Sequence, residues 1–127
     1  MKIIDIIQKS DDCFAGTGAT NEVINDAEKV LNVVFNTEYR AYLAKYGVVA
    51  VNGHELTGIC SSKRLNVVNV TRAEREDKDV PVGWYVVEQL NIDGIVVWQA
   101  EDGVIYQTAP SSKAIKLCDS LAEYIVM

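Results

Sequence analysis

The sequence predicts an α+β domain in which helices lie on one side of a mostly antiparallel sheet. Three observations favour this class. Apolar residues recur at three- and four-residue spacing over residues 22–46, which is the period of an amphipathic helix. Beyond Gly47 the apolar residues alternate or run continuously, and Asn-Gly and Asp-Gly pairs typical of two-residue turns separate them. Helical and extended segments do not alternate along the chain, which argues against a parallel βαβ architecture.

Length and charge narrow the function classes. A chain of 127 residues, 49% of them hydrophobic, fits a single domain over residues 1–127. Twelve basic and eighteen acidic residues give a formal charge of −6, which argues against direct nucleic-acid binding because lysine and arginine drive that binding. No signal-peptide pattern opens the chain, and no apolar run approaches the ~18–20 residues of a membrane span. We therefore expect a soluble, cytoplasmic protein with no membrane contact, and a basic partner suits its charge.

The N-terminal segment predicts one short helix and a loop. Four isoleucines within residues 3–7 form an apolar turn too brief to be stable alone, so we expect it to dock against other helices. Residues 10–20 are expected to be a connecting loop. Their Gly16-Thr17-Gly18 lacks the third glycine, the preceding strand and the Gly-Lys-Ser/Thr of a phosphate-binding loop.

Residues 22–47 predict two neighbouring helices. The first has an apolar stripe of Ile24, Ala27, Leu31 and Val34. After Phe35, the pair Asn36-Thr37 offers an N-cap for the second, which Gly47 ends as a left-handed C-cap. The apolar side of this second helix carries Tyr39, Tyr42, Leu43 and Tyr46.

The middle of the chain predicts a hairpin and a third long helix. Residues 48–51 and 54–56 flank Asn52-Gly53, the pair best suited to a two-residue turn with positive φ. Residues 64–78 predict a helix, although three β-branched valines weaken the prediction. Its expected apolar residues are Leu65, Val68 and Ala73.

The C-terminal half predicts a three-stranded meander over residues 84–92, 95–101 and 104–108. If Asp93-Gly94 and Asp102-Gly103 form two-residue turns, the register follows. In that register Leu90 faces Val97, Glu88 faces Gln99, Ala100 faces Ile105 and Gln99 faces Tyr106. Ser120-x-x-Glu123 then predicts a capping box at the start of a closing helix.

The same packing and turn residues carry a family resemblance. The pattern consists of Ile24, Ala27-Glu28, Leu31, Val33, Phe35, Tyr39-Arg40, Tyr42-Leu43, Tyr46-Gly47, Gly53, Glu55-Leu56 and Gly58-Ile59. Over about residues 20–124 the chain resembles the SUKH superfamily, which includes bacterial toxin-immunity proteins and fungal cell-wall-synthesis regulators. Similar sequences usually place a proline just before the second helix, where this chain has Asn36-Thr37. The resemblance implies a single SUKH-like domain with N-terminal helices packed on a mostly antiparallel sheet and a C-terminal helix.

The residues give no catalytic signature. A serine or cysteine hydrolase needs a histidine beside its nucleophile, and the only histidine, His54, follows a hairpin turn where a structural or surface role is common. Glu101-Asp102-Gly103 has the composition of a tight turn rather than of a catalytic or metal-binding carboxylate pair. Three cysteines, without C-x-x-C spacing, favour neither a disulfide framework nor a zinc site: Cys13, Cys60 and Cys118. We expect no catalytic residues, no metal and no cofactor, and therefore not an enzyme; turnover lost on His54→Ala would revive that alternative.

One segment, residues 79–112, combines acidic and aromatic residues without any lysine or arginine. Protein interfaces use aromatic anchors ringed by charge, and a negative face accelerates association with a positive partner. The candidate partner-binding residues are Glu55, Glu88, Asp93, Glu101, Asp102, Trp84, Tyr85 and Trp98. The alternative is that the tryptophans fill the core and the acids only solubilise turns.

The resemblance implies a function that the residues alone do not. Small bacterial members act as immunity proteins, so we expect a protein that binds and neutralises a cognate polymorphic or contact-dependent toxin. That toxin would be a nuclease with a basic cleft, which an acidic surface occludes. The alternative is a non-enzymatic scaffold or regulatory protein-interaction domain of the same fold. Self-association through an exposed strand edge is left open.

Overall fold

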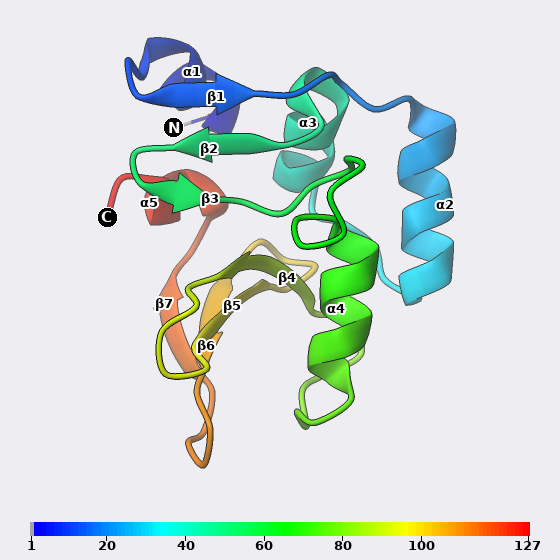
Figure 1. Ribbon diagram of the computed structural model, residues 1–127, viewed down its shortest axis with the longest axis vertical. Helices are drawn as coiled ribbons and strands as arrows, with labels where there is room; N and C mark the ends of the chain where they lie inside the picture. The colour runs from blue at the N-terminus through cyan, green and yellow to red at the C-terminus, as the bar shows by residue number, and fades with distance from the viewer. Residues whose placement is uncertain (1) are drawn as a thin grey trace.

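Helices pack against two antiparallel sheets in the computed structural model, which describes residues 2–127 (Figure 1). The elements are α1 (Ile3–Lys9), β1 (Cys13–Ala15), α2 (Asn21–Leu31), α3 (Thr37–Tyr46), β2 (Val49–Val51), β3 (His54–Glu55), α4 (Val67–Arg75), β4 (Tyr85–Gln89), β5 (Val96–Gln99), β6 (Ile105–Thr108), β7 (Ile115–Cys118) and α5 (Leu121–Ile125). A small sheet has the order β1-β2-β3 and a large sheet the order β4-β5-β6-β7. The predicted α+β class is confirmed, with two sheets where one was expected. Within residues 2–127, every helix is too short or too polar to cross a membrane.

Helix α2 is shorter than its apolar pattern indicates. Thr20 caps its start by accepting the N–H of Val23. The helix ends at Leu31 because Asn32 adopts the left-handed conformation, at φ 55°, that asparagine tolerates better than most residues. Val34, predicted to belong to the buried stripe, therefore lies beyond the helix and is 56% exposed. That part of the prediction is wrong.

Helix α3 begins and ends where its sequence predicts. The side chain of Asn36 accepts the N–H of Glu38, which confirms the predicted N-cap. Gly47 follows the helix with a positive φ of 71°. Its ψ of −56° is not left-handed helical, because the N–H of Val48 donates to the carbonyl of Tyr46 and closes a γ-turn.

The small sheet contains one predicted hairpin and one strand that the sequence did not reveal. Asn52 and Gly53 both have positive φ and join β2 to β3, with Val51 opposite His54, as predicted. β1 lies within residues 10–20, which were expected to form a loop. A strand of three residues is too short to show an alternating pattern. The predicted docking of α1 is confirmed, since its buried Ile3 and Ile7 belong to the main core.

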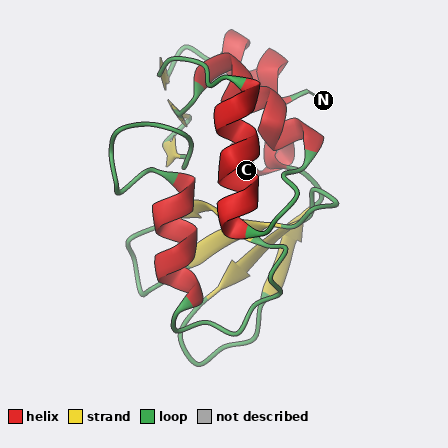
Figure 2. Cartoon of the chain, turned by 90° about the vertical axis from the view of Figure 1, so that its right-hand side faces the viewer, coloured by secondary structure: helices red, strands yellow, loops and turns green. Residues whose placement is uncertain are grey.

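Helix α4 covers the open edge of β4, beside α2 (Figure 2). Its fully buried residues are Val67, Val70 and Thr71. Of the three expected apolar residues, Val68 is half-buried against the main core, Leu65 precedes the helix and Ala73 is exposed. The hydroxyl of Thr71 accepts the N–H of Val86 at 3.0 Å. The N–H of Val86 lies on the edge of β4 that has no partner strand, so it needs another hydrogen-bond acceptor. This explains why the side of α4 that carries Thr71 faces the sheet.

The large sheet contains the predicted meander, but both predicted registers are wrong. Glu88 faces Val97 instead of Gln99, because the loop after β4 is longer than two residues and a bulge lies between Val86 and Glu88. Leu90 correspondingly donates to the carbonyl of Ile95 instead of facing Val97.

The second turn has three residues, because Ala100 bonds to Val104 and Gly103 takes a φ of 95°. Gln99 consequently faces Ile105, and Trp98 faces Tyr106. A fourth strand, β7, was not predicted.

Both faces of the large sheet are covered by side chains. One face contributes Tyr85, Val97 and Ile105 to the main core beneath the helices. The other contributes Val86, Val96 and Trp98 to a second cluster with Val70 of α4, Val80 and Trp84. As a result β5 is buried along its whole length.

A partly buried polar network joins α3, α5 and the large sheet. The carboxylate of Glu38 accepts the N–H groups of Leu121 and Ala122 at 2.7 and 2.9 Å, which caps the start of α5. Gln99 donates to the same carboxylate at 3.0 Å. Ser120 accepts the N–H of Glu123, which confirms the predicted cap.

Candidate partner-binding surface

Three of the predicted partner-binding residues lie inside the protein. Trp98 and Tyr85 are fully buried, and Glu88 is 4% exposed. The hydroxyl of Tyr85 accepts the N–H of Asn36 and donates to Gln99, and burial raises its pKa well above the usual value. These residues therefore do not form a contact surface in this structure. They are buried because the strands that carry them are covered on both faces.

Glu88 organises a polar contact among three elements. One of its oxygens accepts from the hydroxyl of Tyr124 at 2.6 Å and lies 2.9 Å from Nδ1 of His54. The other accepts the N–H of Glu55 at 2.8 Å. Burial and the Glu88 carboxylate raise the pKa of Tyr124, so its hydroxyl stays a donor. Because a carboxylate accepts, Nδ1 of His54 carries a proton here. His54 thus contributes to joining β3, β4 and α5.

The remaining predicted residues do not gather in one place. Asp93 follows β4 and Glu101-Asp102 follows β5, so the two turns lie at opposite ends of the antiparallel sheet. Glu55 lies on the small sheet, where both of its oxygens accept from Arg64, which lowers the pKa of its carboxyl. Trp84 is half-buried and stacks on Tyr106, with ring centroids 4.2 Å apart.

One end of the large sheet nevertheless carries several exposed carboxylates. We call this set the acidic end, and it consists of Glu101, Asp102, Asp119 and Glu123. Gly103 brings the β5–β6 turn beside Asp119, because a Cβ added there would lie 3.5 Å from the Asp119 carbonyl oxygen. Lys116 pairs with Asp119 at 2.7 Å, and this contact, with Asp102 contributing less, raises the pKa of the lysine.

Asp119 and Glu123 were not among the predicted residues. Asp119 precedes α5 and only the fold places it beside the β5–β6 turn, while Glu123 lies one helical turn further along, in α5. Their one signal in the sequence was the capping pattern that marks the start of this helix.

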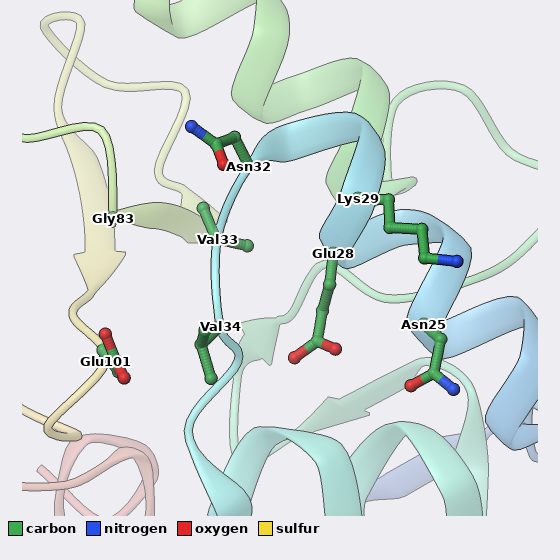
Figure 3. A pocket seen from close by; sticks show the side chains of 8 residues that line it. All are labelled: Asn25, Glu28, Lys29, Asn32, Val33, Val34, Gly83 and Glu101. Carbon is green, nitrogen blue, oxygen red and sulfur yellow. The ribbon is translucent and has the colours of Figure 1, made fainter.

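A hollow of about 530 Å³ adjoins the acidic end (Figure 3). It is lined by Asn25, Glu28, Lys29, Asn32, Val33, Val34, Gly83 and Glu101. Figure 3 shows the exposed side chain of Val34 between the carboxylates of Glu101 and Glu28. The hollow thus offers an apolar contact beside the exposed carboxylate of Glu101, whereas Glu28 is paired with Arg40 and Lys29 also lines the hollow.

Hydrogen bonds fix the wall of this hollow. Glu28 accepts the N–H of Phe35 at 2.8 Å and pairs with Arg40 at 2.9 Å. Arg75 donates to the carbonyls of Leu31 and Trp84, which ties the end of α2 to the segment before β4. The segment that carries Val34 is therefore held in place before any partner arrives.

The chemistry of this surface is suited to attraction and docking. Exposed carboxylates raise the local concentration of a positive partner, and an apolar side chain beside them supplies contact area. Among residues 2–127, no three histidine, cysteine, aspartate or glutamate side chains are grouped as metal ligands.

One known family matches almost the whole chain. Residues 1–126 match the family SUKH_5, described as SMI1-KNR4 cell-wall. No curated protein matches the chain.

Proposed function

The chain belongs to the SUKH superfamily, in its SMI1-KNR4 cell-wall family, and from this membership we propose that it is an immunity protein. It binds a cognate toxin of a polymorphic or contact-dependent system in the cytoplasm and neutralises it. The toxin is a nuclease whose basic cleft normally holds nucleic acid. Inhibition is by occlusion, without chemistry on the part of this protein.

The acidic end and its adjoining hollow support this proposal most directly. A nuclease cleft uses lysine and arginine to bind phosphates, and exposed carboxylates such as Glu101 and Asp102 occupy the same positions by charge complementarity. Val34 gives the contact an apolar anchor. An interface of ordinary size would bury about 800 Å² on each partner.

A second candidate is a regulatory protein-interaction domain that recruits a cellular partner. The description of the matched family, which refers to the cell wall, favours this alternative. The gene immediately upstream distinguishes the two. A large toxin gene there supports immunity, and a housekeeping operon supports regulation.

We expect Glu101→Lys/Asp102→Lys to weaken binding to the purified product of an upstream toxin gene by roughly 10-fold or more, because like charges then meet at the interface. Most of the loss should appear in the association rate, and the salt dependence of binding should decrease. Surface plasmon resonance at several salt concentrations measures both quantities.

A matched control variant reverses the charge of two exposed acidic side chains elsewhere on the protein. Glu76→Lys/Asp79→Lys changes the net charge by the same amount near the β6–β7 hairpin, at the other end of the large sheet. This control should bind like the wild type apart from a small general effect of charge. Equal weakening in both variants would mean that net charge acts without a specific acidic site.

A further inference from the structure

Strand β1 is an open edge of the small sheet, and Figure 1 shows it as the outermost strand. The N–H of Gly16 donates to Val48, and the carbonyl of Asp12 accepts from Asn52. In an antiparallel pair, alternate residues bond to the partner strand. Phe14 therefore directs its backbone groups toward β2, while those of Cys13 and Ala15 point away from the sheet.

The side chain of Phe14 is the most exposed large apolar group in residues 2–127, at 80%. It lies on the outer face of the sheet with Ala50 and Glu55, which occupy the same position in β2 and β3. Hollows of about 240 and 190 Å³ lie beside it. One of them borders Gly16 and Val48.

The edge strand of the large sheet, β7, is protected in the usual way and β1 is not. Lysine on an edge strand discourages pairing with another chain, and β7 carries Lys116. β1 has neither lysine, proline nor a bulge. β1 is protected only by being short. A strand of three residues can form few new hydrogen bonds with another chain, but it can still form them.

We propose that two copies of this protein associate by antiparallel pairing of their β1 strands about a two-fold axis at Phe14. Cys13 of each copy then pairs with Ala15 of the other, and the two pairs exchange backbone hydrogen bonds. The two Phe14 side chains meet on the same face as a non-hydrogen-bonded cross-strand pair, the closer kind. The small sheets of the two copies become one continuous sheet.

Charge complementarity favours a second copy as the occupant. In this register Asp12 of one copy lies opposite Gly16 of the other, so Asp11 and Asp12 approach the residues that follow β1. There Gly18 packs on the end of α3. A Cβ added to Gly18 would lie 2.1 Å from the carbonyl oxygen of Ala44 and 3.0 Å from that of Lys45. Among residues 2–127, neither aspartate nor Lys45 forms an ion pair. The two-fold axis brings the aspartates that precede β1 in each copy to the helix turn that carries the exposed Lys45 in the other, and it does so twice.

Sedimentation equilibrium in reducing buffer, up to millimolar concentration, tests this inference on the purified protein. The average mass should rise from 14.0 kDa toward twice that value as concentration increases. Phe14→Lys should abolish the rise, because two like charges then face each other across the axis. A wild-type protein that remains monomeric at millimolar concentration would overturn the proposal.

Two further variants separate this pairing from association through another surface. Ile115→Lys, at an exposed apolar position on β7, should associate like the wild type. Loss of association in this variant would show that the copies meet at the β7 edge instead of the β1 edge. Lys45→Glu should weaken the dimer several-fold, and Asp12→Lys/Lys45→Glu should restore it. Failure of this restoration would contradict the two-fold register. The test needs no toxin, so its outcome is independent of the proposed immunity function.

Discussion

Gly58→Ala is expected to destabilise the protein by about 3 kcal/mol or more, because backbone atoms fill the space that a side chain would need. A Cβ on Gly58 would lie 1.9 Å from the carbonyl oxygen of Gly47 and 3.0 Å from the Cα of Val48. The contact cannot relax by rotating a side chain. Moving the backbone would break the hydrogen bond from Ile59 to Gly47 and that from Gly58 to Leu65. Urea unfolding followed by far-UV circular dichroism measures the loss.

Gly83→Ala is the matched control for this prediction. No atom lies within 4 Å of the position that its Cβ would take, and its φ is not in the positive range. We expect a change of stability within about 0.5 kcal/mol. An unchanged unfolding midpoint in Gly58→Ala would show that the segment around Gly58 is not held against Gly47.

Trp98→Ala is expected to cost about 3–5 kcal/mol, the usual range for deleting a buried tryptophan. The side chain is fully buried against Val86 and Val96, and its indole N–H donates to the hydroxyl of Thr108 at 2.9 Å. Removal leaves both a cavity and an unpaired hydroxyl. Urea unfolding by circular dichroism, which does not depend on tryptophan emission, is the appropriate measurement.

The half-buried Trp84 provides the comparison. Trp84→Ala loses the stacking contact with Tyr106 but leaves a smaller internal cavity, so its cost should be clearly less. Equal losses of unfolding free energy in the two variants would contradict the packing role of Trp98. A Trp98→Ala protein with wild-type stability and reduced partner affinity would place Trp98 in the interface instead.

Local chemistry explains which elements the sequence could predict. Asn36, Asn52-Gly53 and Ser120 each determine a cap or turn through their own side chain or φ, and each is found where expected. Strands β1 and β7 are three and four residues long and depend on pairing with distant segments. Such strands carry too few residues to show a period.

The misplacement of Trp98 in the predicted site has a different physical origin from the register errors, which come from turn lengths and a bulge. Alternation identifies a surface only when one face of a strand is solvated, and β5 is buried on both faces. Trp98 therefore belongs to the core, although its neighbours in sequence are acidic turns. Conversely, Asp119 belongs to the same acidic end as Asp102 only because the fold brings the β7–α5 junction beside the β5–β6 turn.

Residual toxin activity during titration tests the central claim most directly. Purified protein is added to the nuclease encoded immediately upstream, and cleavage of a nucleic-acid substrate is followed. We predict that cleavage stops at an equimolar ratio and that the Glu101→Lys/Asp102→Lys variant needs a large excess for the same effect. Full cleavage in the presence of excess wild-type protein would contradict the immunity function.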